Sequence, residues 1–150
     1  MKEKQHGLYT EIEIEKGFLD LTTQEERCII HFYHPDFRRC AIMDTHLQKL
    51  TKKYFETKFA KISVEKAKYF VEKLKIRILP AVICFKNGIV VDRIVGFEEL
   101  GNTDSFQTEI LERRLGKSGV IDVPDVRPPN KTVFGFTSKT DDSSSDDDDY

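Results

Sequence analysis

The side chains of this sequence that could do chemistry gather in residues 28–40, where two cysteines and two histidines lie close together. Cys40 is the first candidate, because it is predicted to lie in the first turn of a helix, where the helix dipole favours a thiolate. Arg38 and Arg39 beside it would add positive charge. A reactive thiol there would form mixed disulfides or respond to oxidants; the alternative is an inert thiol in the core. Three positions earlier stands Phe37, and because a phenyl ring cannot replace an attacking thiolate, turnover by a dithiol route is excluded.

The same stretch could be mistaken for a zinc site, because thiolates and imidazoles are ligands that zinc prefers. Residues 28–33 are an apolar run that predicts a buried strand, however, and in a strand Cys28 and His31 face opposite sides of the sheet. We therefore expect no metal. His31 could move protons, but it is better explained as a histidine satisfied within the core, and Cys84 as a core residue. The sequence has no glycine-rich phosphate-binding motif, so no cofactor is expected.

Composition favours a soluble protein in a reducing, intracellular setting. The three cysteines are odd in number and irregularly spaced, which gives no disulfide framework. The polar first residues do not look like a secretory signal, and no apolar run approaches the roughly 18 residues needed to span a bilayer. The expected location is the cytoplasm, with the nucleus and the centrosome as alternatives.

The net charge of −2 is unevenly distributed along the chain. Six of the last ten residues are aspartates, and the rest of the chain carries 24 basic against 20 acidic groups. This is not the signature of a nucleic-acid-binding protein, which would need a basic stripe. Ser143, Ser144 and Ser145 precede the last acidic run and suit an acidophilic kinase of the casein kinase 2 type. The alternative is a charged tail that only keeps the protein hydrated and is not phosphorylated.

The elements that must position these side chains follow from the spacing of apolar residues. The pattern predicts strands at 9–14, 28–33 and 59–64, and helices at 16–23, from 37 or 38 to about 56, at 65–75 and, after an N-cap at Thr103-Asp104, to Leu115. Asn87-Gly88 between β-type runs at 81–86 and 89–95 predicts a hairpin with a two-residue type I′ turn. This order is typical of an α/β sandwich. Residues 117–150 are rich in Pro, Ser and Asp, and we expect a disordered acidic tail.

The order of elements resembles the thioredoxin fold over residues 9–116. The resemblance rests on Phe32-Tyr33, Lys61, Ile78-Leu79-Pro80, Phe85-Lys86-Asn87-Gly88 and Val95-Gly96. In thioredoxins the proline at the position of Pro80 is cis and helps to bind extended peptides. Only about 5% of X–Pro bonds in folded proteins are cis, so this expectation rests on the resemblance alone. Cys40 matches the second, resolving cysteine of that fold, Phe37 replaces the first, and His31 stands where thioredoxins place a buried carboxylate.

Within this fold, several separated segments resemble the phosducin-like family. They are residues 6–9, 28–33 with Arg39-Cys40, 64–67, 95–106 and the acidic, serine-bearing C-terminus. The resemblance implies a non-catalytic cytosolic protein that binds the cytosolic chaperonin, the TCP-1 ring complex, and modulates the folding of actin and tubulin. Family members carry a helical N-terminal extension ahead of the thioredoxin-like domain. Residues 1–8 are therefore expected to be a remnant of such an extension or a linker.

The expected binding surface lies where this fold presents a peptide-sized groove. It is made of Phe37, Arg38, Arg39, Cys40, Leu79 and Pro80. Phe37 would be an apolar anchor or would plug the former active site. The alternative function is a weak monothiol redox protein or thiol sensor that uses Cys40, and a third is an interaction domain with an unrelated client.

Overall fold

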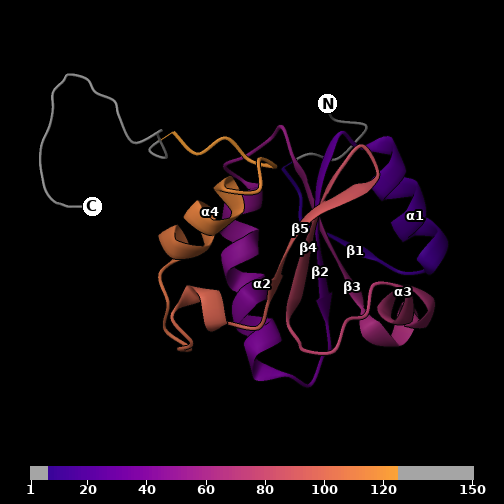
Figure 1. Ribbon diagram of the computed structural model, residues 1–150, viewed down its shortest axis with the longest axis horizontal. Helices are drawn as coiled ribbons and strands as arrows, with labels where there is room; N and C mark the ends of the chain where they lie inside the picture. The colour runs from indigo at the N-terminus through magenta and orange to yellow at the C-terminus, as the bar shows by residue number, and fades with distance from the viewer. Residues whose placement is uncertain (1–6, 125–150) are drawn as a thin grey trace, which may run out of the picture.

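The computed structural model describes residues 7–124 and shows one sheet with helices on both faces (Figure 1). The strands are β1 (Thr10–Ile12), β2 (Arg27–Tyr33), β3 (Lys58–Ser63), β4 (Ala81–Lys86) and β5 (Ile89–Val95). Their spatial order is β1-β3-β2-β4-β5. The first three pair in parallel, and β4 runs antiparallel to both β2 and β5. Parallel pairing early and an antiparallel hairpin late confirm the predicted mixed sheet.

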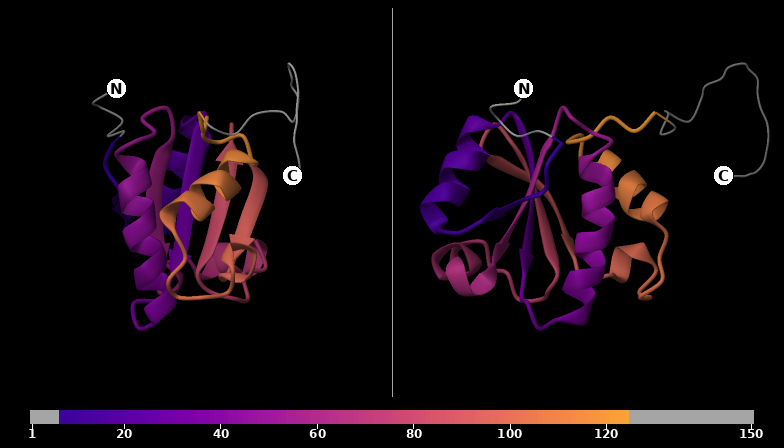
Figure 2. Two further views of the ribbon diagram at one scale, coloured as in Figure 1. Left: turned by 90° about the vertical axis from the view of Figure 1, so that its left-hand side faces the viewer. Right: turned by 180° about the vertical axis from the view of Figure 1, so that it is seen from behind.

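Four α-helices cover this sheet in two layers (Figure 2). They are α1 (Glu15–Gln24), α2 (Arg38–Thr51), α3 (Lys68–Lys73) and α4 (Thr108–Gly116), with 3₁₀ turns at Val64–Lys66 and Glu98–Leu100. Helices α2 and α4 lie on one face and α1 and α3 on the other, so the predicted three-layer sandwich is confirmed. In the part of the chain that the structure describes, no helix has the length and apolar character needed to cross a membrane.

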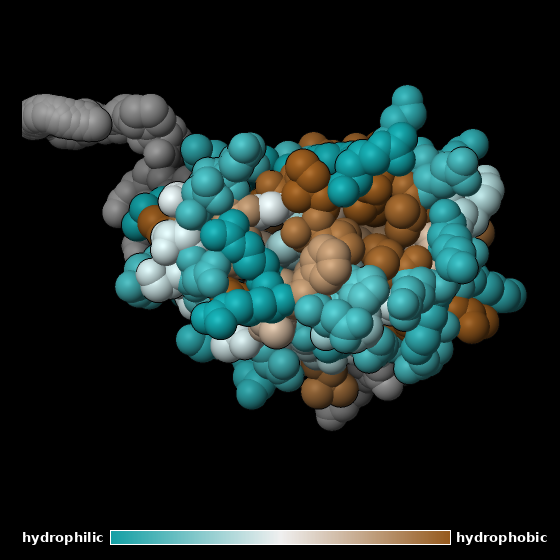
Figure 3. Space-filling view, turned by 90° about the horizontal axis from the view of Figure 1, so that it is seen from below, coloured by the Kyte–Doolittle hydropathy of each residue, from teal (hydrophilic) through white to brown (hydrophobic). Residues whose placement is uncertain are grey.

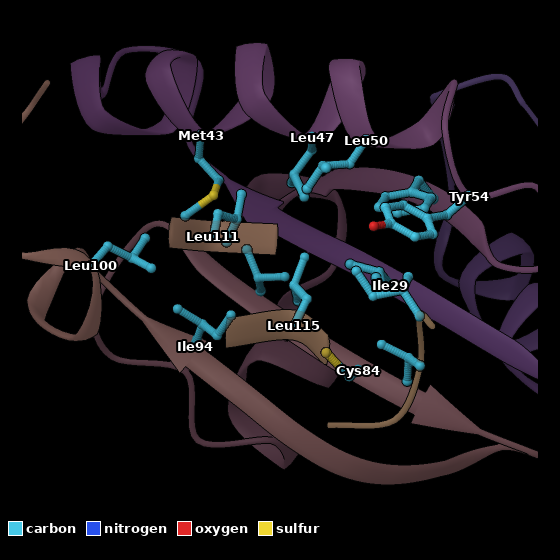
Figure 4. Packing of buried hydrophobic residues seen from close by; sticks show 14 of the residues in the cluster. Ile29, Met43, Leu47, Leu50, Tyr54, Cys84, Ile94, Leu100, Leu111 and Leu115 are labelled. Carbon is cyan, nitrogen blue, oxygen red and sulfur yellow. The ribbon is translucent and has the colours of Figure 1, made fainter. Parts of the chain in front are cut away.

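The side chains of β2 divide between two hydrophobic clusters because successive residues of a strand point to opposite faces. Ile29 packs toward α2 and α4, and Cys28, Ile30 and Phe32 toward α1 and α3. Figure 4 shows the first cluster, which includes Ile29, Met43, Leu47, Leu50, Cys84, Ile94, Leu111 and Leu115. Cys84 is therefore a core residue, as predicted.

The hairpin between β4 and β5 also follows the sequence. Asn87 and Gly88 both have positive φ, 52° and 81°, as a type I′ turn requires. A β-bulge interrupts the ladder between Cys84 and Phe85. The hairpin places β5 at one edge of the sheet and leaves β1 at the other.

Three helices are shorter than their apolar patterns predict. Ser63 accepts a hydrogen bond from the Glu65 amide, so a 3₁₀ turn occupies the first part of the predicted helix at 65–75, and α3 begins only at Lys68. Lys75 follows α3 in a left-handed conformation. The long helix ends at Thr51, although Tyr54 still packs in the core.

The last helix begins later than the predicted N-cap at Thr103-Asp104. Gln107 caps α4 instead, without a side-chain hydrogen bond. Asp104 pairs with two arginines, and the Thr103 hydroxyl bonds to Ser105, so neither side chain is free to cap a helix. Residues 101–105 form an irregular segment that runs beside the N-terminal end of α2.

The predicted boundary between domain and tail at residue 116 is too early. Val120 and Ile121 are buried in the cluster between α2, α4 and the sheet. The Thr57 hydroxyl donates a hydrogen bond to the Val120 carbonyl oxygen, and the Arg27 guanidinium pairs with Asp122 at 3.0 Å. The packed body therefore includes these residues, and the rest of the predicted tail, from 125 on, lies outside the described residues.

Candidate functional site

Two segments far apart in the sequence meet at one end of the sheet. β2 ends at Tyr33, β4 begins at Ala81, and Phe32 pairs with Ala81. The loop after β2 and the residues before β4 therefore lie side by side. Figure 3 shows this end of the molecule face-on, with apolar side chains gathered inside a rim of polar ones.

Phe37 lies at the start of α2 in an extended conformation and is 47% exposed. Its ring packs against the ring of His34, with the two centroids 4.9 Å apart. His34 is held in turn by the Asp36 amide, which donates to Nδ1 at 3.1 Å. Phe37 thus presents an apolar ring at the surface and does not plug the interior.

Arg38 and Arg39 are turned away from the thiol and toward residues 97–104. Arg39 Nε donates to Asp104 Oδ1 at 2.8 Å and Nη1 donates to Asn102 Oδ1 at 3.2 Å. The Arg39 guanidinium also lies 4.7 Å from the ring centroid of Phe97. Arg38 Nε lies 3.2 Å from the other oxygen of Asp104. The two charges expected to favour a thiolate are therefore directed at a carboxylate. The sequence reasoning did not place residues 97–104 at this end of the molecule.

Cys40 is only 2% exposed. Burial raises the pKa of its thiol, and the negative charge of Asp44 raises this pKa further. A backbone hydrogen bond with His34 acts in the opposite direction but does not reverse the shift. The thiol is therefore protonated at neutral pH and shielded from reagents, which favours the inert alternative.

A partly buried polar network lies one turn further along α2, with His31 as its fully buried member. Asp44 Oδ1 accepts a hydrogen bond from Tyr9 Oη at 2.6 Å and lies 3.1 Å from His31 Nδ1. Lys61 Nζ donates to the other oxygen of Asp44 at 2.7 Å. Within the part of the chain described, His31 Nε2 has no hydrogen-bond partner. The predicted core histidine is thus satisfied at one nitrogen only.

The network fixes the charges of its members. Burial opposes ionisation of Asp44, but hydrogen bonds with His31, Lys61 and Tyr9 outweigh it and lower the pKa of the carboxyl to about 2. Burial lowers the pKa of His31, so its imidazole is neutral at neutral pH. An ionised acid between a lysine, a tyrosine and a neutral imidazole ties α2 to β2, β3 and the segment before β1.

Asp44 was missed by the sequence reasoning, although the sequence contained a signal for it. It stands four residues after Cys40 and three before Leu47, both of which are buried. This spacing puts an acid on the apolar side of α2, where a carboxylate needs partners. His31 was singled out because it replaces a buried carboxylate, and the structure supplies a carboxylate from the neighbouring helix.

Pro80 completes this end of the molecule. The Leu79-Pro80 peptide bond is cis, as the resemblance implied. The Gly96 amide donates to the Pro80 carbonyl oxygen at 2.8 Å, which joins the start of β4 to the end of β5. Leu79 is half-buried against the cluster beneath α1 and α3, whereas Ile78 is exposed.

The remaining candidates concern a metal and phosphorylation. Residues 7–124 contain no group of three or more His, Cys, Asp or Glu side chains that could hold a metal ion. Cys28 and His31 lie on opposite faces of β2, as the alternation of the strand predicted. Ser143, Ser144 and Ser145 lie outside the described residues.

Comparison with known proteins agrees with this geometry. The thioredoxin family model matches residues 11–110. Oxidised thioredoxin from Plasmodium falciparum superimposes with a TM-score of 0.62 at 21% identity, covering 73% of this chain and 97% of the other. Thioredoxin f from spinach chloroplast gives a TM-score of 0.65 at 18% identity, covering 79% of this chain and 94% of the other. At these low identities, the two structural similarities show the fold alone.

Several curated relatives are much more similar in sequence. Human thioredoxin domain-containing protein 9 is 43% identical, with 97% of this chain and 70% of that protein covered. Phosducin-like protein 3 of Dictyostelium discoideum is 50% identical over 78% of this chain and 63% of its own length. Thioredoxin domain-containing protein plp1 of Schizosaccharomyces pombe is 45% identical over 89% of this chain and 48% of its own length. The chain thus spans about half to two thirds of these relatives. It belongs to the thioredoxin family and, within that family, to the phosducin-like group.

Proposed function

We propose that this protein is a non-catalytic phosducin-like module that binds the cytosolic chaperonin, the TCP-1 ring complex, and modulates the folding of actin and tubulin. The proposed contact surface is the end of the molecule around Phe37, Arg38, Arg39, Cys40, Leu79 and Pro80. Membership of the phosducin-like group supports the choice of partner. The proposal also places the protein in the cytoplasm, where that chaperonin works.

One observation carries the non-catalytic part of the proposal. An exposed phenyl ring stands at the position of the attacking thiol, while the thiol of Cys40 is buried and has a raised pKa. The cis-proline next to it is retained. This end of the molecule therefore keeps a surface for contacting an extended chain and lacks the nucleophile that would cut a disulfide. The half-exposed ring is suited to be an anchor, because aromatic side chains dominate binding energy at protein interfaces.

A monothiol function for Cys40 has weaker support from the geometry. A reactive cysteine needs an accessible thiolate. The Cys40 thiol is buried, and its burial also raises the pKa and so disfavours ionisation. The two flanking arginines, which would have promoted ionisation, pair with Asp104. Replacing Cys40 with serine should accordingly leave the capture of a protein partner almost unchanged.

The binding surface is tested by co-migration of the full chain with purified TCP-1 ring complex on a native gel. We expect co-migration of the unaltered chain and at least a tenfold weaker interaction for Phe37→Ala, because a buried anchor contributes about 2 kcal/mol or more. Leu19→Ala is the matched control, because Leu19 is 50% exposed and lies on α1, on the face of the sheet opposite α2. A chain that fails to co-migrate, or that loses affinity equally in both variants, would contradict the proposed surface.

The proposed loss of redox activity is tested by restoring a cysteine at position 37. With dithiothreitol as the electron donor, Phe37→Cys is expected to give the protein disulfide-reductase activity toward insulin that the unaltered chain lacks, because a thiol at an exposed helix start is easily ionised. Adding Cys40→Ser to that variant should abolish turnover, since the mixed disulfide would have no resolving thiol. If the unaltered chain already reduced insulin, the non-catalytic proposal would be wrong.

A further inference from the structure

Strand β1 forms one edge of the sheet, and its outer side is open to a further strand. Within residues 7–124, β1 pairs with β3 and no strand pairs with its outer side. Its three residues are in unbroken register with β3, so no β-bulge turns this edge away from an incoming chain. An exposed strand edge presents backbone N–H and C=O groups that can pair with an extended segment.

A hollow of about 330 Å³ lies along this edge, between β1 and α1 (Figure 1). Residues 10–14 form one wall, and Gly17, Leu21 and Gln24 of α1 form the other. These three residues are spaced four and three apart, so they share one face of the helix. Gly17 has no side chain and Leu21 is only partly buried, so the hollow is open and has an apolar wall. Its volume is at the lower end of the range for ligand sites, which suits the side chains of an added strand.

The side chains of an added strand would alternate between this hollow and the other face of the sheet. Ile12 faces the hollow side, because it packs in the cluster beneath α1 and α3. Glu11 faces the α2 side, where its carboxylate accepts a hydrogen bond from the Tyr33 hydroxyl. Directly opposite residues on neighbouring strands lie on the same face, with Cβ atoms about 5 Å apart. A residue beside Ile12 would therefore enter the hollow, and one beside Glu11 would meet a carboxylate.

The charge of Glu11 favours a basic residue at that position. Glu11 is exposed, and the hydroxyl group that it binds is neutral. Its neighbour across the ladder, Lys61, directs its ammonium group to Asp44 at 2.7 Å. Glu13, in contrast, is paired with Lys66 at 2.6 Å. Among the residues described, Glu11 thus has no ion-pair partner, and its charge remains available to a ligand.

We propose that the outer side of β1 binds an extended segment of another protein, in which apolar side chains alternate with basic ones. The segment would add a sixth strand to the sheet. Its apolar side chains would enter the hollow beside Leu21, and a basic side chain would pair with Glu11. The residues that line the hollow do not belong to the end around Phe37 and Pro80. This contact therefore does not depend on the proposed binding of the chaperonin.

The other edge of the sheet, β5, is less suited to such a ligand. A β-bulge interrupts the pairing of β5 with β4, and bulged edges are poor templates for a further strand. The first three side chains of β5 are exposed and apolar. Asp92, the acidic residue of this strand, is paired with Arg114 at 2.5 Å. A basic side chain would find no uncompensated carboxylate on β5.

The test adds a probe peptide to the full chain and follows backbone amide chemical shifts. The probe is acetyl-Val-Lys-Val-Lys-Val-amide, and we expect shift changes centred on residues 10–14 and 17–24. Acetyl-Val-Glu-Val-Glu-Val-amide should bind at least about tenfold more weakly at low salt, because its carboxylates would lie beside Glu11. Equal binding of the two peptides, or shift changes only outside these residues, would overturn the proposal.

Methylation of the peptide nitrogens tests whether the probe binds as a strand. One version of the basic peptide is methylated at its valine nitrogens and a second at its lysine nitrogens. In an extended chain these two sets of amides point to opposite sides. One version should therefore keep the affinity of the parent peptide, and the other should bind at least about tenfold more weakly. Loss of binding in both versions, or in neither, would rule out pairing along one edge.

A matched pair of variants tests the role of Glu11. Glu11→Gln keeps an acceptor for the Tyr33 hydroxyl and loses the charge, so the basic peptide should bind about two- to fivefold more weakly. Glu72→Gln makes the same change at an exposed position on α3 and should leave the affinity unaltered. Equal affinity in the Glu11 variant and the unaltered chain would contradict the assigned charge contact. If the amides of residues 10–14 shifted with protein concentration in the absence of peptide, a second copy would occupy this edge and the proposed ligand would be wrong.

Discussion

Replacing Asp44 with alanine is expected to lower the free energy of unfolding by about 2–3 kcal/mol. Asp44 is a hydrogen-bond partner of Tyr9, His31 and Lys61, and its removal would take a hydrogen-bond partner from the buried neutral imidazole and the counter-charge from Lys61. Breaking a partly buried pair costs more than the pair itself contributes, because the remaining groups stay partly desolvated. Urea unfolding followed by circular dichroism measures the change.

The controls for this prediction are a conservative and an exposed variant. Asp44→Asn keeps the shape and loses the charge, so it should fall between the wild type and the alanine variant. Asp20→Ala removes an exposed i, i+4 pair with Lys16 and should cost less than about 1 kcal/mol. If Asp44→Ala were as mild as Asp20→Ala, the network would not tie α2 to the sheet.

The same carboxyl predicts a pH dependence of stability. The folded pKa of Asp44 is about 2, below the value of about 3.9 for a free aspartate. Its stabilising contribution is therefore complete above pH 4 and is lost as the pH falls from about 4 toward 2. The unfolding free energy of the wild type should fall more steeply across this range than that of Asp44→Ala. Parallel curves would contradict the assignment of a lowered pKa.

Truncation of the chain after Gly116 is expected to cost about 3–6 kcal/mol or to prevent folding. The deletion removes Val120 and Ile121, and a fully buried side chain of either kind contributes about 1.5–3 kcal/mol. It also removes the carbonyl group to which Thr57 donates. A chain that ends at Pro124 retains these contacts and should keep its stability to within about 0.5 kcal/mol.

A full-length variant separates lost packing from lost length. Ile121→Ala should destabilise by about 2–5 kcal/mol, as large-to-small changes in a core do. Val123→Ala, two residues on and only partly buried, should cost less. A truncation after Gly116 that unfolds at the same urea concentration as the chain ending at Pro124 would contradict the extended boundary.

Sequence patterns predicted the parts of this fold that depend on local chemistry. The run at 28–33 and the Asn87-Gly88 turn carry their own signals, an apolar strand and a pair of residues that tolerate positive φ. The start of α4 could not be found in this way, because Thr103-Asp104 looks like a cap until Arg38 and Arg39 compete for Asp104.

The end of the domain was missed for a similar reason. Val120 and Ile121 stand between Gly119 and Asp122, without helical or strand periodicity. Their burial depends on the hydrophobic cluster between α2, α4 and the sheet, which only the assembled fold creates. The candidate site was likewise predicted only in part. The residue types at Phe37 and Cys40 indicated that the attacking thiol is replaced. The directions of the two arginines and the role of Asp44 depend on contacts between residues 13 to 65 positions apart in the sequence.

The burial of all three thiols has a consequence for how a partner would be released. Burial raises the pKa of Cys28, Cys40 and Cys84, that of Cys84 to about 12. A redox-active thioredoxin holds its target through a covalent intermediate, and the surrounding thiol pool then sets the fate of that complex. Under the proposed function the chain forms no such bond, so occupancy of the proposed binding surface would follow the partner concentration and the dissociation constant alone. Oxidative stress should therefore leave its complexes at their ordinary equilibrium.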